Sequence, residues 1–293
     1  MATVTRPRRS VLYMPGSNTR ALEKAKTLAA DGLILDLEDA TAPDAKEEAR
    51  RHVVAAAGQY GKREVLIRVN GLNTPWGHDD IKAAAASEAD GILLPKVESA
   101  DAVRLCAHIM DEAGAPADMA IWCMMETPLG ILHAEEIANA SPRMGGFVMG
   151  TSDLAKDLHA EHTKMRLPFV TSLGLCALAA RAYGLALLDG VYLDLQDDEG
   201  FKDSCVQGRE FGFDGKTLIH PKTIGMANEA FAPSTEQVEW SRRIIDAHAE
   251  AVKEGKGVVV VDGKLIENLH VENAKRLVSL SEQIDELEAA AGA

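Results

Sequence analysis

The run GLILDLED at residues 32–39 decides the fold of this chain. Its first part is too short for a helix, is rich in Leu and Ile, and is apolar on both alternating faces, which is typical of a buried parallel strand. Its second part is acidic and places Asp36, Glu38 and Asp39 where the strand ends. The run therefore predicts a parallel sheet that is covered on both faces and carries polar groups at its carboxyl edge.

Seven further runs repeat this pattern along the 293 residues: RSVLYMPG (9–16), EVLIRVN (64–70), GILLPKV (91–97), MAIWCMMET (119–127), GFVMGTSD (146–153), LALLDG (185–190) and KTLIHP (216–221). The segments between them have helical spacing, as in DAKEEARRHVVAAAGQY (44–60), and several begin with a Ser, Asp or Asn that could cap a helix. Eight successive βα units predict a (β/α)8 barrel over residues 1–232. A doubly wound open sheet is the alternative.

The remaining residues, 233–293, have no place in the eight units. They predict a helix at about 235–253, a hairpin in GKGVVVVDGKLIE (255–267) with its turn at the Asp-Gly pair, and a final helix at about 268–290. This extension is expected to pack on the barrel, on a neighbouring subunit, or over the barrel mouth.

Composition excludes several classes of partner. A net charge of −14 argues against a nucleic-acid surface, which needs clustered Lys and Arg. No apolar run is long enough to span a membrane, and the four cysteines are widely spaced without a CxxC pair. Reduced core thiols of this kind predict a cytoplasmic protein.

Polar residues end nearly every predicted strand, and in a (β/α)8 barrel all these ends meet at one rim. In chain order they are Asp36, Glu38, Asp39, Arg68, Asn70, Lys96, Glu126, Ser152, Asp153, Asp189 and His220. Any single one could be a helix cap or part of a surface ion pair. Together they form a rim that is mostly carboxylate and would repel an anionic substrate.

A divalent cation would neutralise such a rim, and carboxylate oxygens favour the hard ions Mg²⁺ or Mn²⁺. Glu126 and Asp153, at the ends of neighbouring strands, are the best-placed ligand pair. Arg68 could then hold a substrate carboxylate through a bidentate contact.

Seven stretches, taken together, carry a family resemblance: RSVLYMPGSNTRALEKA, DLEDA, RVNG, PKVE, METPLGI, MGTSDLAKDL and DGKTLIHPKT. In order and spacing the chain resembles the citrate lyase beta subunit and malyl-CoA lyase group of the HpcH/HpaI aldolase superfamily. Within that group, GFDGKTLIHP followed by VVDGKLIENLH is most similar to the (3S)-malyl-CoA thioesterase branch. The resemblance implies a metal-dependent barrel that acts on the CoA thioester of a short hydroxy diacid.

The resemblance also assigns roles to individual residues. Glu126 and Asp153 match the magnesium ligands, and Arg68 matches the arginine that holds the acid end of the substrate. Glu38 and Asp39 match an acidic pair near the metal, and Lys96 is expected beside them. The positions that match substrate contacts are Tyr13 and Lys24 for the CoA part, where Asn18 replaces an Arg of some relatives, and Ser152, Ile219 and His220.

The resemblance further implies that the C-terminal extension is a lid, often exchanged between subunits of a trimer or hexamer. In the lyases the lid carries a catalytic Asp, and Glu267 stands at that position here. One extra methylene moves the carboxylate away from the position that carbon–carbon cleavage needs, so hydrolysis of (3S)-malyl-CoA to malate and CoA is the favoured function. A malyl-CoA, β-methylmalyl-CoA or citramalyl-CoA lyase is the alternative, and a non-catalytic CoA-thioester-binding subunit is a third.

Overall fold

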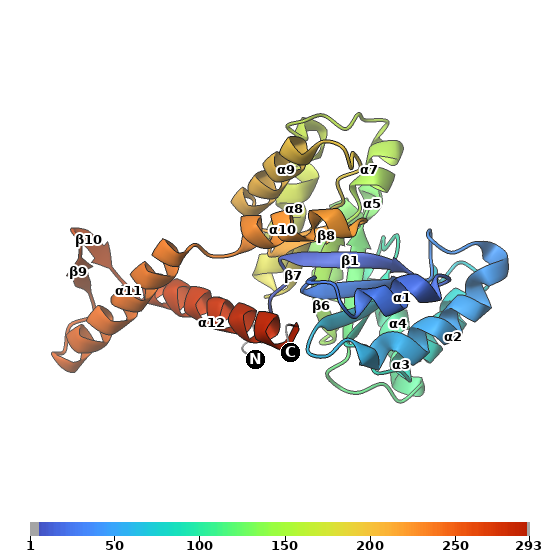
Figure 1. The fold of residues 1–293 in the computed structure, drawn as a ribbon, viewed down its shortest axis with the longest axis horizontal. Helices are drawn as coiled ribbons and strands as arrows, with labels where there is room; N and C mark the ends of the chain where they lie inside the picture. The colour runs from blue at the N-terminus through green and yellow to red at the C-terminus, as the bar shows by residue number, and fades with distance from the viewer. Residues whose placement is uncertain (1–5, 292–293) are drawn as a thin grey trace. The chain divides into compact units, whose positions relative to one another are not determined.

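The computed structural model describes residues 6–291, so the extreme ends of both predicted domains, 1–5 and 292–293, lie outside the described residues. Eight parallel strands close into a barrel, with helices packed around them (Figure 1). The strands are β1 (Ser10–Pro15), β2 (Gly32–Asp36), β3 (Glu64–Arg68), β4 (Gly91–Leu94), β5 (Ala120–Met125), β6 (Met144–Met149), β7 (Ala186–Asp189) and β8 (Gly215–Leu218). The predicted (β/α)8 barrel is confirmed.

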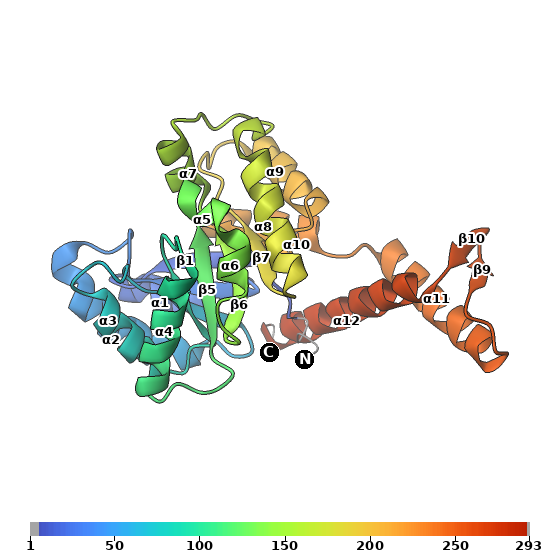
Figure 2. The ribbon, with the colours of Figure 1, turned by 180° about the vertical axis from the view of Figure 1, so that it is seen from behind.

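The helices alternate with the strands, and a view from behind shows α5, α6 and α8 on the outer side of β5 to β7 (Figure 2). They are α1 (Thr19–Ala25), α2 (Lys46–Ala56), α3 (Gly77–Ala85), α4 (Ala100–Glu112), α5 (Pro128–Leu132), α6 (Ala134–Ala138), α7 (Thr151–Leu158), α8 (Val170–Ala182), α9 (Asp198–Glu210) and α10 (Ile224–Phe231). Short 3₁₀ turns lie at Pro43–Ala45, Ala57–Gln59, Leu167–Phe169 and Pro221–Thr223.

Closure of the sheet excludes the doubly wound alternative, because each of the eight strands has a neighbouring strand on both sides and β1 pairs in parallel with both β2 and β8. Val11, for example, is level with Gly32 on one side and with Thr217 on the other. An open sheet would have two edge strands, each with a neighbouring strand on one side only.

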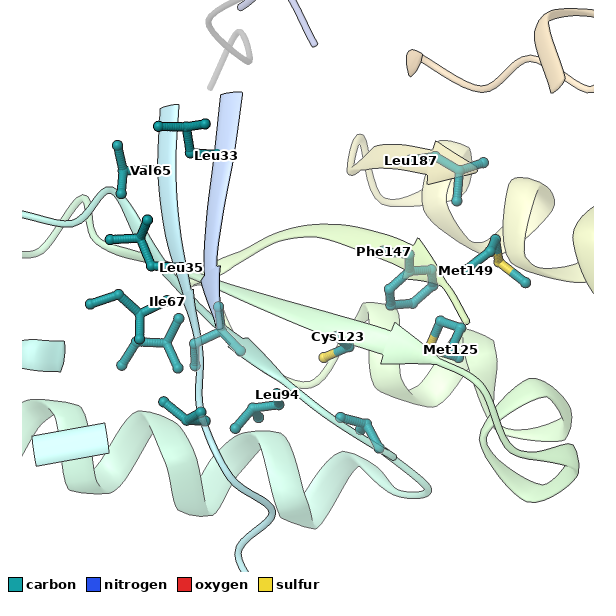
Figure 3. Close-up of a cluster of buried hydrophobic side chains, with 14 of the residues drawn as sticks. Leu33, Leu35, Val65, Ile67, Leu94, Cys123, Met125, Phe147, Met149 and Leu187 are labelled. Atoms are coloured by element: carbon teal, nitrogen blue, oxygen red, sulfur yellow. The ribbon is translucent and has the colours of Figure 1, made fainter. Parts of the chain in front are cut away.

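Two apolar layers form the core, and they explain why the strands are apolar on both faces. One layer fills the barrel interior and includes Ile34, Leu66, Leu93, Trp122 and Val148. The other lies between strands and helices; Figure 3 shows its side chains Leu33, Leu35, Val65, Ile67, Leu94, Cys123, Met125, Phe147, Met149 and Leu187. All four cysteines are buried free thiols, as the sequence predicts.

The strand register fixes which side chains meet at the carboxyl edge. Asp36, the last residue of β2, is level with Arg68, the last residue of β3. Alternation from Ile34 and Leu66, which both face the interior, turns Asp36 and Arg68 inward as well. A buried ion pair at the barrel mouth follows from this register.

The chain divides into two compact units, one of residues 8–231 and one that contains the residues from Ala232 on. The second unit holds α11 (Thr235–Lys253), the hairpin of β9 (Val259–Val261) and β10 (Lys264–Ile266), and α12 (Asn268–Ala291). The predicted Asp-Gly turn is present, with φ of 47° at Asp262 and 77° at Gly263. A small core of Ile244, Ile266, Val271 and Ala274 joins these elements.

The first unit ends next to the predicted domain boundary at residue 232, while the role of the extension as a lid stays a prediction. Within residues 6–291, no helix combines the length and the apolar character needed to cross a membrane.

Asp189 is a correction to the sequence analysis, which placed it on the rim. Leu188 faces the barrel interior, so Asp189 points to the other side of β7, where it is fully buried. Arg166 Nη1 donates to both of its oxygens at 2.7 and 2.9 Å, and Lys216 Nζ donates at 2.8 Å. Burial opposes ionisation of Asp189, but Lys216 and Arg166 outweigh it and lower its pKa.

We expect Asp189→Ala to destabilise the protein by about 3–5 kcal/mol, because it leaves two buried cations without their shared anion. Lys216→Met should cost less, since Asp189 keeps its two bonds to Arg166. Urea unfolding measures both changes, with Glu199→Gln, which removes an exposed ion pair to Lys202, as the control. An Asp189→Ala variant as stable as that control would contradict the assignment.

Candidate active site

A cavity of about 820 Å³ opens at the carboxyl ends of β2, β3 and β4. Its wall carries charged side chains from the loops after β2 and β4 and from α2 and α7, among them Glu38, Asp39, Lys96 and Asp153. Trp76 and Leu72 from the loop before α3 supply an apolar part of the lining. Part of the predicted rim lines this cavity, namely Glu38, Asp39, Asn70, Lys96 and Asp153, while Arg68 and Glu126 lie behind it in contact with Glu38 and Lys96. The size of the cavity suits a small-molecule ligand.

Arg68 is the centre of the charged groups. Its Nε and Nη2 donate to the two oxygens of Asp36 at 2.7 and 2.6 Å, which is a bidentate pair. Its Nη1 lies 3.0 Å from Glu38 Oε2 and 3.5 Å from Asp39 Oδ2. The guanidinium carbon also lies 4.9 Å from the centre of the Tyr13 ring, a cation–π contact.

The pairing with Asp36 changes the expected role of Arg68. Sequence analysis expected a bidentate contact with substrate, but one edge of the guanidinium is already bound to Asp36. An incoming acid group would meet the edge formed by Nη1 and the second hydrogen of Nη2, where it would compete with Glu38. Asp36 fixes this edge toward the acidic residues.

Lys96 links the carboxylates of three strand ends. Its Nζ donates to Glu38 Oε1 at 2.6 Å and lies 3.7 Å from Asp153 Oδ2, while its backbone N–H donates to Glu126 Oε1 at 2.8 Å. Its φ of 48° is in the left-handed region, which costs a lysine about 1–2 kcal/mol. These three contacts hold the strained residue in place. Its backbone N–H binds Glu126, whereas its side chain reaches Glu38 and Asp153.

Glu126 is buried, with 2% of its surface exposed, at the end of β5. Burial raises the pKa of Glu126 to about 7, although the hydrogen bond from the Lys96 backbone opposes the shift. Burial also raises the pKa of Glu38, against the effect of Arg68 and Lys96. A cation at this position would favour the ionised form of both carboxyl groups.

Gly150, at the junction of β6 and α7, makes room for Glu126. A Cβ at this position would lie 2.3 Å from Glu126 Oε2 and 2.4 Å from Glu126 Cβ. Its φ of −104° is one that other residues adopt freely, so the requirement for glycine is one of space alone. Sequence analysis missed this residue, because nothing in GTSD indicates that a carboxylate lies over the glycine.

The donor set fits a hard divalent cation. No group of three or more His, Cys, Asp or Glu residues within residues 6–291 is arranged to hold a metal, but magnesium takes one or two carboxylates and fills its other positions with water and substrate. The Oε2 atom of Glu38 is buried and accepts no hydrogen bond of good geometry from the described residues, and its one cationic neighbour among them is Arg68 Nη1 at 3.0 Å. Asp153 lies 3.7 Å from the Lys96 ammonium group, and Glu126 accepts from the backbone N–H of the same residue, so the two carboxylates converge on one residue.

The other residues predicted from the resemblance lie outside this network of contacts. Lys24 is exposed on α1, Ser152 is exposed in the first turn of α7, and Ile219 is 42% exposed after β8. His220 caps the 3₁₀ turn at Pro221–Thr223, where its Nδ1 accepts from the Lys222 N–H at 3.1 Å. Asn18, by contrast, has a clear structural role, because its side chain caps α1 by accepting from the Ala21 N–H.

Glu267 lies in the C-terminal unit, just after β10. Its side chain is exposed, and its backbone N–H donates to His270 Nδ1 at 3.0 Å. Its carbonyl accepts from the backbone of His270 at 3.0 Å, which begins α12. The side chain makes none of the contacts that fix the start of the helix, so its carboxylate is free of a structural role at this point.

An eight-stranded βα barrel with an acidic, cation-bridged mouth defines a class of proteins that bind small molecules at the carboxyl ends of their strands. Within that class, this chain belongs to the HpcH/HpaI aldolase/citrate lyase family, whose sequence model matches residues 9–221. The resemblance seen in the sequence is confirmed.

Three relatives place the chain within the family. The (3S)-malyl-CoA thioesterase of Cereibacter sphaeroides is 51% identical over 287 residues, 97% of this chain and 98% of that protein. Citrate lyase subunit beta of Escherichia coli is 34% identical over 285 residues, 95% of this chain and 94% of that protein. A structure of the protein CitE from Mycobacterium tuberculosis in complex with magnesium, acetoacetate and coenzyme A has a TM-score of 0.73 at 27% identity, and covers 95% of this chain and 98% of that chain.

We expect Gly150→Ala to lower catalytic turnover by about a hundredfold, because the new methyl group displaces the Glu126 carboxylate by about an ångström. Steady-state kinetics and thermal unfolding, measured together, separate loss of the site from loss of the fold. The matched control is Gly174→Ala in α8, where a Cβ meets no atom within 4 Å and should stabilise the helix by about 0.5–1 kcal/mol. Wild-type turnover in Gly150→Ala would refute the role of Glu126.

Proposed function

We propose that this chain is a metal-dependent thioesterase that hydrolyses (3S)-malyl-CoA to malate and CoA. The observation that carries this proposal is the 51% identity to a (3S)-malyl-CoA thioesterase over nearly the whole of both chains. The acidic, cation-bridged mouth of the barrel supports it, because a small hydroxy diacid needs both a fixed cation and a metal-binding carboxylate pair.

Arg68 is proposed to bind the acid end of the malyl group. Its buried charge is held by Asp36, and its Nη1 lies beside Glu38 and Asp39, which line the cavity. A fixed cation in a mostly buried position attracts a carboxylate more strongly than one in water. Lys96, which lines the cavity and contacts Glu38 as Arg68 does, adds a second positive charge.

Glu126 and Asp153 are proposed to hold Mg²⁺, with Mn²⁺ as the other possible ion. When bound, such a cation polarises a substrate oxygen and stabilises the negative charge that develops during hydrolysis. Glu38 and Asp39 would lie near the cation and contact it through water. The CitE structure that superposes on this chain contains magnesium, which supports the assignment.

The CoA part is proposed to contact Tyr13 and Lys24, with Ser152, Ile219 and His220 at further substrate positions. The exposed Lys24, Ser152 and Ile219 suit this role, because most of the CoA molecule is polar, whereas Tyr13 is partly buried against Arg68 and could meet only the inner end of the substrate. Support comes from the resemblance and from the coenzyme A in the CitE complex.

Glu267 is proposed as the general base. Its carboxylate takes a proton from water while the water oxygen bonds to the thioester carbonyl carbon, and the C–S bond then breaks to release CoA as a thiolate. This assignment, with the lid role of residues 233–293 and its exchange within a homo-oligomer, trimer or hexamer, rests on the resemblance. A cytoplasmic location is likewise proposed from the free thiols.

The alternative function is a malyl-CoA, β-methylmalyl-CoA or citramalyl-CoA lyase, which would break the C2–C3 bond and release a 2-oxo acid and an acyl-CoA. The 34% identity to citrate lyase subunit beta keeps it open. A non-catalytic CoA-thioester-binding subunit is less favoured, because such a subunit would not need the strained Lys96 or the buried Glu126.

Product analysis separates these functions. With (3S)-malyl-CoA and Mg²⁺ we expect malate and free thiol in equal amounts. Chromatography measures the malate, and a thiol reagent measures the free CoA. Acetyl-CoA and glyoxylate as the main products would establish the lyase instead. No turnover on any of the three acyl groups would favour the binding subunit.

We expect Glu267→Gln to slow hydrolysis by about 10²–10⁴-fold, because the side chain loses the group that accepts the proton. Glu267→Asp should also slow hydrolysis, by about a hundredfold, and should raise the share of carbon–carbon cleavage products. Glu272→Gln, at an exposed position of α12, is the matched control. Undiminished hydrolysis in Glu267→Gln would remove Glu267 from the mechanism.

A further inference from the structure

Lys46, the first residue of α2, is a buried lysine beside the site, and the sequence analysis gave it no role. Only 6% of its surface is exposed. Its Nζ donates to two backbone carbonyls of the acidic loop, defined as residues 37–41 after β2: Leu37 O at 2.8 Å and Glu38 O at 2.7 Å. One ammonium group therefore ties the start of α2 to the segment that carries Glu38.

Lys46 does not use its charge in an ion pair. Among the described residues, no carboxylate lies within 4 Å of its Nζ, and its further neighbour is the Trp76 ring, 5.5 Å away at the centre. Burial lowers the pKa of Lys46, against the effect of Asp36 and Glu38. Burying a cation is costly unless strong acceptors replace its water. The carbonyls of Leu37 and Glu38 are those acceptors for Lys46.

The Leu37 carbonyl is also held from a second side. Asn70 Nδ2 donates to Leu37 O at 3.0 Å and to Asp80 Oδ2 at 2.6 Å. Asp80 is fully buried and accepts from Arg50 Nε at 2.6 Å. The acidic loop is thus held in two ways. Lys46 binds it directly, and a chain of hydrogen bonds from Arg50 in α2 through Asp80 in α3 to Asn70 ends at the Leu37 carbonyl.

The acidic loop sets the geometry of the site, because Glu38 is the one carboxylate that contacts both Arg68 and Lys96 in the described structure. Its Oε2 is 3.0 Å from Arg68 Nη1, and its Oε1 is 2.6 Å from Lys96 Nζ. A movement of the Glu38 backbone would alter both distances. Lys46 lines the same cavity as Glu38 and Lys96, so it is reachable from the substrate side.

We propose that Lys46 is a positioning residue for catalysis, which holds the acidic loop through two N–H···O=C bonds and thereby fixes Glu38 between Arg68 and Lys96. The inference rests on the proposed thioesterase function. In this role Lys46 acts through Glu38 and not through a contact with the reacting atoms. Holding the loop requires N–H donors within hydrogen-bond distance of the Leu37 and Glu38 carbonyls. A positive charge without such donors does not replace them.

The test is chemical rescue of Lys46→Ala, which opens a space beside the cavity. We expect kcat for (3S)-malyl-CoA to fall by about a hundredfold with a smaller change in KM, because the loop loses its fixed position. Ethylammonium, which carries N–H donors, should restore at least a tenth of the lost rate. Tetramethylammonium, which carries the same charge without a donor, should restore none.

Three further variants keep the test decisive. Lys46→Arg retains donors and should keep more activity than Lys46→Met, which retains only the apolar stem and stays measurable if Lys46→Ala does not fold. Lys82→Ala, an exposed position of α3, should behave as wild type. Equal rescue by both cations, or wild-type kcat in Lys46→Met, would overturn the inference.

Failure of the proposed function is distinguishable from failure of this inference. If the wild-type protein releases acetyl-CoA and glyoxylate, the thioesterase proposal fails, and the same comparison of ethylammonium with tetramethylammonium is made on the rate of that cleavage. Selective rescue of either rate supports the role of Lys46. Rescue that does not depend on the N–H donor contradicts it.

Discussion

The buried guanidinium of Arg68 is the group around which the mouth of the barrel is arranged. A cation at this depth is stable only where anions and hydrogen-bond acceptors surround it. The parallel register of β2 and β3 supplies Asp36 at the same level, and the acidic loop brings Glu38 and Asp39 to the other side. The excess negative charge that results explains why Lys96 adopts a strained backbone beside Glu38, and why a divalent cation suits the remaining carboxylates.

Much of this arrangement could be predicted from the sequence. Eight short apolar runs fix the barrel, because strand length and burial on both faces leave few other architectures. Convergence of Arg68, Lys96 and Asp153 follows, since parallel strands end at one edge. The rest depends on facts that the sequence does not show. Asp189 lies one residue from an inward position and so faces the helices, and Lys46 contacts backbone carbonyls, which no side-chain pattern marks.

The difference between hydrolysis and carbon–carbon cleavage is small on this scaffold. Both need an anchored acid group and a cation that polarises a carbonyl, and they differ in where a carboxylate accepts or delivers a proton. In the proposed mechanism the exposed carboxylate of Glu267, one methylene longer than the Asp that the resemblance implies for the lyases, is the group that separates the two reactions. Lys46, in contrast, serves the shared part of the site, because it fixes the acidic loop whatever bond is broken.

The acidic mouth is proposed to hold a divalent cation, and Mn²⁺ binding without substrate tests this proposal most directly. Electron paramagnetic resonance should count about one tightly bound Mn²⁺ per wild-type chain. Glu126→Gln and Asp153→Asn should each weaken binding by at least tenfold, while Asp111→Asn, on the exposed face of α4, should not. Equal Mn²⁺ affinity in wild type and both site variants would contradict the account.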